Sequence, residues 1–313
     1  MNPLAALYGG VVRARNDLYD RGTLTVRRLR GPVVSIGNVA VGGSGKTPFL
    51  IALGELLLQR GIAFDVLSRG YGRATHGVAL VDPGGSPRDF GDEPLLIARK
   101  LRVPVIVGEQ RYVAGQFAEQ RFGPQLHLLD DGFQHRQLAR DFDIVMVTPT
   151  DARDALLPAG RLREPLSSLA RANAVVLTNS SSPQDLPIHG AQLWRVTRGI
   201  IALQVTAPCF AFCGIARPQN FFVDLRAAGI PLCGTMTFSD HHRYTRSDIL
   251  SVQAESKRCA AAAFVTTEKD AINLASLAAE LSPLHIVAAR MQLHDSDSAV
   301  DAILARTGTW MPR

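Results

Sequence analysis

The sequence has no apolar run long enough to cross a membrane. About 20 consecutive apolar residues are needed to span a bilayer, and no segment of the 313-residue chain approaches this length. The N-terminal residues also lack the continuous apolar core of a secretory signal peptide. The sequence therefore predicts neither a membrane-spanning protein nor a secreted one.

Cysteine is scarce, and its placement argues against the common cysteine-based sites. The four cysteines, Cys209, Cys213, Cys233 and Cys259, form no C-x-x-C pair and have no spacing typical of metal ligands. We therefore expect small core residues in a reducing cytosol rather than a redox or metal centre. The chain also lacks internal repeats and low-complexity tracts, so its length suits one large or two ordinary globular domains.

The strongest functional signal is a glycine-rich segment, residues 33–48 (VVSIGNVAVGGSGKTP). An apolar run typical of a buried strand leads into three glycines and a Lys-Thr pair, and a helix-compatible run follows. Glycines allow backbone N–H groups to converge on an anion, and the N-terminus of the new helix adds partial positive charge there. This order predicts a phosphate-binding loop. Its expected nucleotide-binding residues are Val41, Gly42, Gly43, Ser44, Gly45, Lys46, Thr47 and Pro48.

Two side chains of this loop have predicted chemical roles. Lys46 can reach the β- and γ-phosphates of a nucleoside triphosphate, and the Thr47 hydroxyl can hold Mg²⁺. Ala40 stands where the common pattern has glycine, so a glycine-rich turn with an incidental lysine is the alternative. The strand before the loop and the helix after it favour nucleoside triphosphate binding.

Short apolar strand-like runs alternate with helical patterns over residues 33–178. This alternation implies right-handed crossovers and a P-loop NTPase-like α/β fold, with a mostly parallel sheet covered by helices. A Ser/Pro-rich stretch, residues 179–187, reads as a linker, and a smaller α/β unit follows it. We expect a lead-in at residues 1–30, a P-loop core domain at 31–180 and a smaller α/β domain at 190–313.

Acidic residues follow one of the predicted strands. The apolar run 126–129 leads directly into Asp130 and Asp131, and ligands of a parallel sheet bind beyond the carboxyl ends of its strands. A carboxylate at this place is typical of the Mg²⁺ side of a phosphate-loop protein, whereas a simple Asp- and Gly-rich turn is the alternative. The loop upstream favours the metal site.

The residues alone do not decide the role of two further segments. Asp92, before a predicted helix, reads as an N-cap with Pro94 in the first turn. Asp240, His241 and His242 form an Asp-His group that can orient an imidazole for proton transfer or can be a surface loop. Zinc binding by the two histidines is disfavoured, because the other histidines show no ligand spacing.

The charge distribution singles out the N-terminus. The chain has a net charge of +6, and residues 1–30 carry six arginines against two aspartates. At about 100° per residue, the apolar side chains of this segment fall on one broad arc, with Arg13 and Asp17 opposite. A basic amphipathic helix suits a membrane surface, and an ordinary helix packed on its own domain is the alternative.

Taken together, these segments resemble the tetraacyldisaccharide 4′-kinases of lipid A biosynthesis, over nearly the whole chain. The matching motifs are residues 35–48 (SIGNVAVGGSGKTP), 68–73 (SRGYGR), 91–94 (GDEP), 107–111 (VGEQR), 129–135 (LDDGFQH), 157–165 (LPAGRLREP), 214–218 (GIARP), 238–244 (FSDHHRY) and 267–271 (TEKDA). The order and spacing of these motifs are far more specific than the loop alone. The family shares the shortened glycine pattern, so Ala40 does not argue against the resemblance.

The resemblance implies an ATP- and Mg²⁺-dependent kinase that phosphorylates the 4′-hydroxyl of a tetraacyldisaccharide 1-phosphate to form lipid IVA. It also implies a peripheral protein at the cytoplasmic face of the inner membrane. A lipid substrate favours the membrane interpretation of the N-terminal helix, with Leu4, Leu7, Val11 and Leu18 entering the lipid boundary. No obligate protein partner is expected.

The resemblance also implies roles for individual residues. Asp92 is the implied base toward the sugar hydroxyl, paired with His241, and Lys46 completes the catalytic set. The implied metal ligands are Thr47, a carboxylate from Asp130 or Asp131, and Glu93. The arginines implied to bind phosphates of ATP or the 1-phosphate of the substrate are Arg69, Arg73, Arg111 and Arg163.

A P-loop GTPase or ATPase that acts as an assembly or metal-delivery switch is the alternative function. A GTPase would need a guanine-reading Asn-Lys-x-Asp motif at a late strand end, and the candidate at residues 178–180 has no Lys or Asp at the right spacing. Nucleic acid would suit the basic charge, but no known module signature is present. The expected partners are therefore a lipid substrate and a membrane surface, and no nucleic acid.

Overall fold

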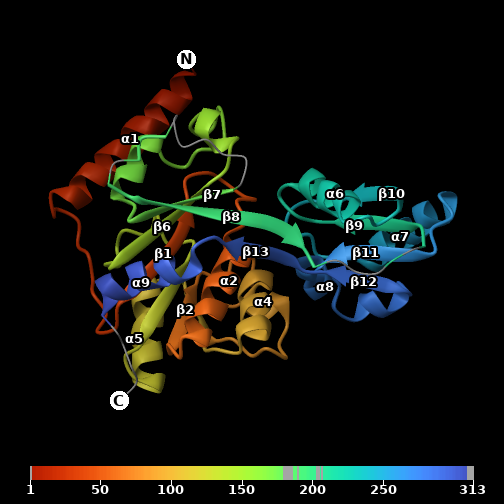
Figure 1. Cartoon of the computed structure of the whole chain (residues 1–313), viewed down its shortest axis with the longest axis horizontal. Coiled ribbons are helices and arrows are strands. Elements are labelled where there is room, and N and C mark those ends of the chain that lie inside the picture. The colour runs from red at the N-terminus through yellow and green to blue at the C-terminus, as the bar shows by residue number, and fades with distance from the viewer. Residues whose placement is uncertain (1, 179–185, 189, 202–204, 206, 309–313) are drawn as a thin grey trace.

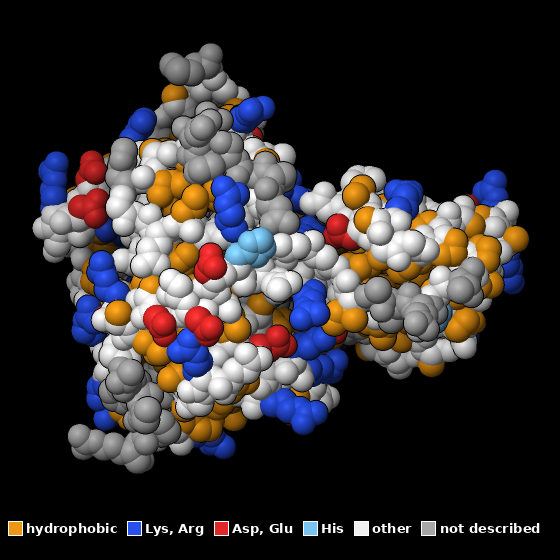
Figure 2. Space-filling model, viewed as in Figure 1, with side chains coloured by type: hydrophobic (Ala, Val, Ile, Leu, Met, Phe, Trp, Pro, Cys, Tyr) orange, Lys and Arg blue, Asp and Glu red, His pale blue; other side chains and the backbone are white. Residues whose placement is uncertain are grey.

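The chain folds into a larger and a smaller lobe (Figure 1). This computed structural model describes residues 2–178, 186–188, 190–201, 205 and 207–308. Each lobe is built around one sheet, and the larger lobe carries the N-terminus. The space-filling view shows a narrower junction between the two lobes (Figure 2).

Nine strands form the sheet of the larger lobe, in the order β13-β8-β7-β6-β1-β5-β2-β4-β3. Neighbours are parallel except for β3 against β4 and β13 against β8. The central strands read as unbroken apolar runs because both faces of the sheet are covered. The strands are β1 (Val33–Asn38), β2 (Phe64–Ser68), β3 (Ala79–Leu80), β4 (Val105–Val107), β5 (Leu126–Asp130), β6 (Phe142–Val147), β7 (Ala174–Thr178), β8 (Gln192–Ile200) and β13 (Ala289–Leu293).

Helices cover both faces of this sheet. Val34 and Ile36 of β1 share one core with apolar side chains of α2, α4 and α9. The neighbouring residue Val33 packs on the opposite face with Ala114 and Ala118 of α5. The helices are α1 (Pro3–Asp20), α2 (Lys46–Gln59), α3 (Pro87–Phe90), α4 (Asp92–Leu101), α5 (Arg111–Phe122), η1 (Asp151–Arg153), η2 (Leu166–Arg171) and α9 (Ser296–Thr307). The predicted α/β fold with a mostly parallel sheet is confirmed.

The smaller lobe has a four-stranded parallel sheet, in the order β10-β9-β11-β12. Its core includes two of the four cysteines, Cys209 and Cys213, which are fully buried. Its elements are β9 (Cys209–Cys213), α6 (Pro218–Ala227), β10 (Leu232–Thr237), α7 (Arg246–Arg258), β11 (Ala263–Thr267), α8 (Glu268–Leu274), η4 (Ala275–Glu280) and β12 (Leu284–Val287). This sheet is the second, smaller α/β unit that the sequence predicts.

The boundary between the lobes differs from the expected one. Within residues 190–313, β8, β13 and α9 belong to the sheet and core of the larger lobe. Hydrogen bonding accounts for this, because β8 extends the sheet beside β7 and β13 pairs with β8. We propose that residues 31–178, 190–200 and 289–308 form the core domain and residues 207–287 the smaller one. Most of the predicted linker, residues 179–187, lies outside the described residues.

Helix α1 has a packed face and an exposed face. Asn2 caps its start by accepting a hydrogen bond from the Leu4 backbone N–H at 3.0 Å. Asn16 and Tyr19 are buried against the larger lobe, so the helix packs on its own domain. The opposite face exposes the apolar side chains Leu4, Leu7, Val11 and Leu18. Among the helices that the structure describes, none is long and apolar enough to span a membrane.

A buried polar cluster fixes the start of β5. Nδ1 of His127 lies 2.7 Å from Oδ1 of Asp65 on β2, and Nε2 lies 3.6 Å from Oε1 of Glu119 on α5. Burial lowers the pKa of His127, but the two carboxylates outweigh burial and raise this pKa above its ordinary value of 6.5. The cluster ties β5 to both neighbours, and Asp130 stands at the other end of the same strand.

We expect this cluster to make the stability of the protein depend on pH. Because the folded-state pKa of His127 is raised, its contribution to the free energy of unfolding is complete below about pH 6.5 and is lost as pH rises through the raised value. Urea unfolding from about pH 6 to about pH 8.5 should show this loss, and a weaker pH dependence in His127→Gln. At about pH 6, the free energy of unfolding of the variant should be lower by about 3 kcal/mol, because the variant removes the cation between two buried carboxylates. Parallel pH profiles of the two proteins would contradict this assignment.

Candidate active site

The glycine-rich segment forms a loop between β1 and α2, as its sequence predicts. Helix α2 begins at Lys46, and Gly45 before it has a φ of 82°, a left-handed conformation that favours glycine. A Cβ atom on Gly45 would lie 2.2 Å from Cε of Met291 on β13, so a side chain there would also have to displace this methyl group. A cavity of about 750 Å³ lies against the loop, and all eight residues 41–48 line it.

The loop lysine belongs to a cluster of charged side chains. Nζ of Lys46 donates a hydrogen bond to Oδ1 of Asn38 at 3.0 Å and lies 3.3 Å from Oδ1 of Asp131. Arg163 binds both carboxylate oxygens of Asp131, at 2.9 and 2.8 Å. Burial raises the pKa of Asp131, but Arg163 and Lys46 outweigh burial and hold this pKa well below its ordinary value. Two cations and one anion thus lie beside the loop, where their charges can hold a phosphate chain.

The two adjacent aspartates have different partners. Asp131 follows β5 with a φ of 50°, and this left-handed turn separates its side chain from that of Asp130. The buried Asp130 carboxylate accepts a hydrogen bond from Oγ of Ser68 at 2.8 Å. Burial and the nearby carboxylates of Glu93 and Asp131 raise the pKa of Asp130 to about 7. Negative charge therefore concentrates around Asp130.

These oxygen donors fit a divalent cation. Thr47, in the first turn of α2, lines the cavity together with Glu93, Asp130 and Asp131. Mg²⁺ is commonly held by one or two carboxylates and by the phosphates of its substrate. Within the residues that the structure describes, no group of three or more His, Cys, Asp or Glu side chains could hold a metal. A cation at Thr47 and Asp130 would therefore need phosphate oxygens to complete its ligand set.

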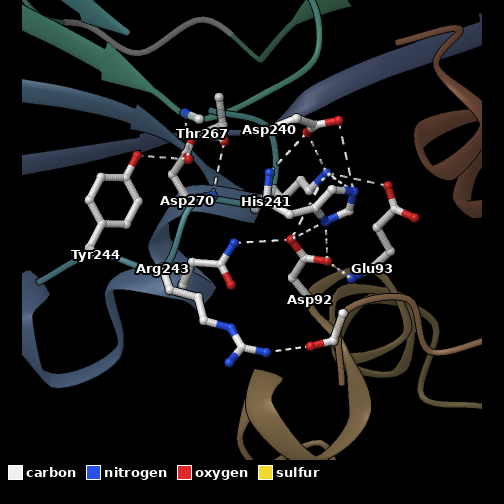
Figure 3. A network of polar contacts seen from close by, with 12 residues as sticks. Asp92, Glu93, Asp240, His241, Arg243, Tyr244, Thr267 and Asp270 are labelled. Atoms are coloured by element: carbon white, nitrogen blue, oxygen red, sulfur yellow. Dashed lines mark hydrogen bonds and ion pairs between the residues drawn. The ribbon is translucent and has the colours of Figure 1, made fainter. Parts of the chain in front are cut away.

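A second polar cluster joins the two lobes (Figure 3). Asp92 is the first residue of α4, and Gly91 rather than Asp92 is the N-cap. Nδ1 of His241 in the smaller lobe lies 3.0 and 2.9 Å from the two carboxylate oxygens of Asp92. Asn273 of α8 donates a further hydrogen bond to Asp92 at 3.0 Å. Burial raises the pKa of Asp92, but His241 and Lys269 outweigh burial and hold this pKa below its ordinary value.

Within this pair, His241 faces the cavity and Asp92 lies behind it. The His241 side chain is 23% exposed and lines the cavity, whereas that of Asp92 is 2% exposed and does not. His241 has a φ of 58°, and its backbone N–H donates to the Gly214 carbonyl at 3.2 Å. Burial lowers the pKa of His241, but Asp92 outweighs burial and raises this pKa above its ordinary value.

Lys269 places one ammonium group among the acidic side chains of both lobes. Its Nζ lies 3.1 Å from Oδ1 of Asp240 and 3.2 Å from Nε2 of His241 in the smaller lobe. The same atom lies 3.4 Å from Oε1 of Glu93 and 3.9 Å from Oδ2 of Asp92 in the larger lobe. Lys269 is therefore a cation shared by the two lobes.

Four of these neighbours were given no role from the sequence alone. Ser68 is the last residue of β2 and Lys269 lies shortly after the end of β11, a position that marks ligand-binding residues in parallel sheets and could have identified them. Asn273 lies inside α8, where the sequence carries no such signal. Tyr71, whose ring centre lies 5.1 Å from that of His241, is exposed on a loop of the larger lobe.

Three of the four expected phosphate-binding arginines line the cavity. They are Arg69, Arg111 and Arg163. The fourth, Arg73, instead binds Oε1 of Glu109 at 2.7 Å and lies outside the cavity lining. Arg217 of the smaller lobe was not expected here. Its side chain lies so close to the loop that a Cβ on Gly43 would be 2.7 Å from its Cγ.

Residues 1–308 match the model of a family described as tetraacyldisaccharide-1-P 4′-kinase. The chain belongs to this family. The tetraacyldisaccharide 4′-kinase of Koribacter versatilis is 52% identical over 314 residues, which cover 97% of this chain and 98% of that protein. The tetraacyldisaccharide 4′-kinase of Aquifex aeolicus is 36% identical over 289 residues, covering 87% and 88%. A crystal structure of the "apo" form of LpxK from A. aeolicus in complex with ATP superimposes with a TM-score of 0.78 at 31% identity, covering 97% and 98%.

We expect Lys269→Met to disturb the junction between the lobes. The change removes the cation shared by Asp92, Glu93 and Asp240, so their carboxylates would repel one another. Steady-state kinetics should show a kcat at least roughly tenfold lower, equivalent to about 1.4 kcal/mol. Lys257→Met, on the exposed side of α7, is the matched control and should keep native kinetics. A native kcat in Lys269→Met would contradict the shared-cation role.

Proposed function

We propose that this protein transfers the γ-phosphoryl group of ATP to the 4′-hydroxyl of a tetraacyldisaccharide 1-phosphate, which gives lipid IVA. One observation carries the proposal: the phosphate-binding loop and His241, which is paired with Asp92, line the same cavity between the lobes. A kinase of this type needs both a grip on the phosphates and a group that accepts the hydroxyl proton. Membership of the kinase family supports the lipid disaccharide as the acceptor.

The phosphate side of the reaction is served by the loop and its neighbours. When bound, ATP and Mg²⁺ supply the transferable phosphoryl group and neutralise its charge. Backbone N–H groups of residues 42–45 and the Lys46 ammonium would bind the β- and γ-phosphates. Thr47 and Asp130 would hold the cation, with Glu93 as a further candidate ligand. Asp131 instead holds Lys46 and Arg163 in position.

The acceptor side of the reaction is served by His241 and Asp92. Because Nδ1 of His241 is bound to Asp92, the other ring nitrogen, Nε2, is the one that can accept the hydroxyl proton, with the hydroxyl taking the place of the Lys269 ammonium that lies 3.2 Å from it. Asp92 orients the ring and stabilises its protonated form. This assignment differs from the expected one, in which Asp92 is the base. The reason is burial, since Asp92 lies behind its partner and does not line the cavity.

Helix α1 supports a peripheral membrane contact. Its exposed face presents Leu7 and Val11, which are 67% and 61% exposed, between Leu4 and Leu18. Apolar side chains on one face and arginines nearby suit the boundary of an anionic bilayer. The protein would thus act at the cytoplasmic face of the inner membrane, where the acyl chains of its substrate lie. The proposal includes no nucleic acid and no obligate protein partner.

Acceptor-dependent ADP release from purified protein tests the proposed function directly. With ATP, Mg²⁺ and the lipid disaccharide, the native protein should release ADP only when the acceptor is present. Lys46→Ala should lower kcat by about 100-fold or more, because it removes charge stabilisation at the transferred phosphoryl group. Lys257→Ala is the matched control and should be native-like. GTP hydrolysis without an acceptor would instead favour the nucleotide-switch alternative.

Single and double variants of the pair test the acceptor side. Asp92→Asn and His241→Ala should each lower kcat by about 100-fold or more, with the KM for ATP little changed. Because the two residues act as a unit, the double variant should lose much less than the product of both effects. His242→Ala is the matched control, because His242 binds Asp248 at 3.1 Å and does not line the cavity. Multiplicative losses would show that the two side chains act independently.

Flotation with anionic vesicles tests the membrane contact. Native protein should float with the vesicles and be partly released at high salt, which screens the arginines. Leu7→Glu with Val11→Glu should abolish flotation, because it removes apolar contact and adds charges that anionic headgroups repel. Leu250→Glu, at an exposed apolar position of α7, is the control. ATP binding should survive in every variant, and equal flotation of all proteins would contradict the contact.

A further inference from the structure

The packed face of α1 contacts a segment that enters the candidate active site. Tyr8 donates a hydrogen bond from its hydroxyl to the backbone carbonyl of Arg163 at 2.9 Å. Two turns later, Asn16 donates its side-chain N–H to Oε2 of Glu164 at 2.9 Å. Glu164 is buried and also accepts a hydrogen bond from Arg171 at 2.9 Å. Helix α1 thus binds two consecutive residues of one segment.

The helix approaches this region closely. Gly9, one residue after Tyr8, is buried, and a Cβ atom there would lie 2.7 Å from Cδ1 of Leu156. A side chain at this position would have to displace the Leu156 side chain or shift α1. This close approach is consistent with a glycine in the middle of a helix, where it costs about 1 kcal/mol relative to alanine.

The contacted segment carries a side chain of the phosphate cluster. The Arg163 guanidinium binds both oxygens of Asp131, which in turn lies 3.3 Å from the Lys46 ammonium. The Arg163 backbone N–H donates to the Val39 carbonyl at 2.7 Å, just before the phosphate-binding loop. A shift of the Arg163 backbone would therefore change the position of its guanidinium group relative to Asp131 and Lys46.

A second set of contacts ties α1 to the turn after Asp131. Nη2 of Arg15 donates to the Gln134 carbonyl at 2.9 Å, and Nη1 of Arg136 donates to the Asn16 carbonyl at 3.0 Å. Both guanidinium groups also lie over the ring of Tyr19, at 5.3 and 5.1 Å from its centre. The helix therefore contacts both segments that supply the Asp131–Arg163 pair.

We propose that α1 is a positioning element of the phosphate site and that Tyr8 sets the place of Arg163. The helix that exposes Leu4, Leu7, Val11 and Leu18 on one face would then hold the phosphate cluster with its other face. This role goes beyond membrane contact, because it acts on the chemistry even when the acceptor is dispersed in detergent. The inference rests on the proposed kinase function.

Tyr8→Phe tests the inference, since it removes one hydroxyl and leaves the ring in place. With a detergent-dispersed acceptor, kcat should fall by about 3- to 10-fold, the range expected for one lost hydrogen bond. The KM for the acceptor should stay native, and the thermal unfolding midpoint should fall by no more than about 4 °C. Tyr112→Phe, on α5 with its ring beside Arg27, is the matched control and should keep native kinetics. A native kcat in Tyr8→Phe would overturn the inference.

A double-mutant cycle separates positioning from a general structural effect. Arg163→Lys removes the paired hydrogen bonds to Asp131, so Tyr8→Phe should have little further effect on kcat in that background. An equal fold-loss of kcat in both backgrounds would show that Tyr8 does not act through Arg163, and would overturn the inference.

Calorimetric ATP binding distinguishes this inference from the proposed function. An inactive native protein would refute the kinase function, whereas ATP affinity tests the link between α1 and the phosphate site by itself. Tyr8→Phe should weaken ATP binding by a few-fold in the native background and much less in Arg163→Lys. Equal ATP affinities of native protein and Tyr8→Phe would count against the inference whatever the activity.

Discussion

The contact between the buried Asp92 carboxylate and the His241 imidazole is the interaction on which the rest of the site depends. The two residues lie on different lobes, so this contact exists only while the lobes are together. A buried carboxylate left without its partner is strongly destabilising, typically by about 3–5 kcal/mol. The approach of the two lobes therefore also orients the His241 imidazole. Asn273 and Lys269 strengthen it with further contacts from the smaller lobe.

Around this contact, the fold brings charged and polar side chains to one edge of the larger sheet and to the phosphate-binding loop. Strands β1, β2 and β5 are parallel neighbours, so their carboxyl ends deliver Asn38, Ser68 and Asp130 to one edge of the sheet. Beside the phosphate-binding loop, Arg163 and Lys46 share Asp131. The carboxylates of Glu93 and Asp131 lie close enough to Asp130 to raise its pKa. The cavity thus offers complementary positions for a phosphate chain and for a cation.

Local patterns in the sequence predicted the parts of the site that depend on local structure. The phosphate-binding loop follows from glycines that adopt positive φ between a buried strand and a helix, and Asp130 follows from its place at a strand end. Strand and helix alternation likewise predicted the sheet and the smaller α/β unit. These features need only a few consecutive residues to specify them.

Features that depend on distant contacts were not predictable in this way. Asp92 and His241 are 149 positions apart, and their pairing came from a family resemblance rather than from any spacing rule. That Asp92 is the more buried residue of this pair follows only from the assembled lobes. The place of β8 and β13 in the larger sheet depends on strand pairing across the whole smaller lobe. Apolar periodicity alone does not distinguish the two faces of α1, because it does not say which apolar side chains find a partner.

The pKa of His241 measured by NMR tests the central contact most directly. Histidine-labelled protein has eight histidines, and His241→Gln assigns the resonance by its loss. Burial lowers the pKa of His241 and the Asp92 carboxylate raises it, so the measured value should lie above 6.5 in native protein. In Asp92→Asn burial and the Lys269 charge oppose protonation, with the Glu93 carboxylate left to favour it, so the pKa of His241 should fall from its native value. The same pKa in both proteins would contradict a direct contact between the two side chains.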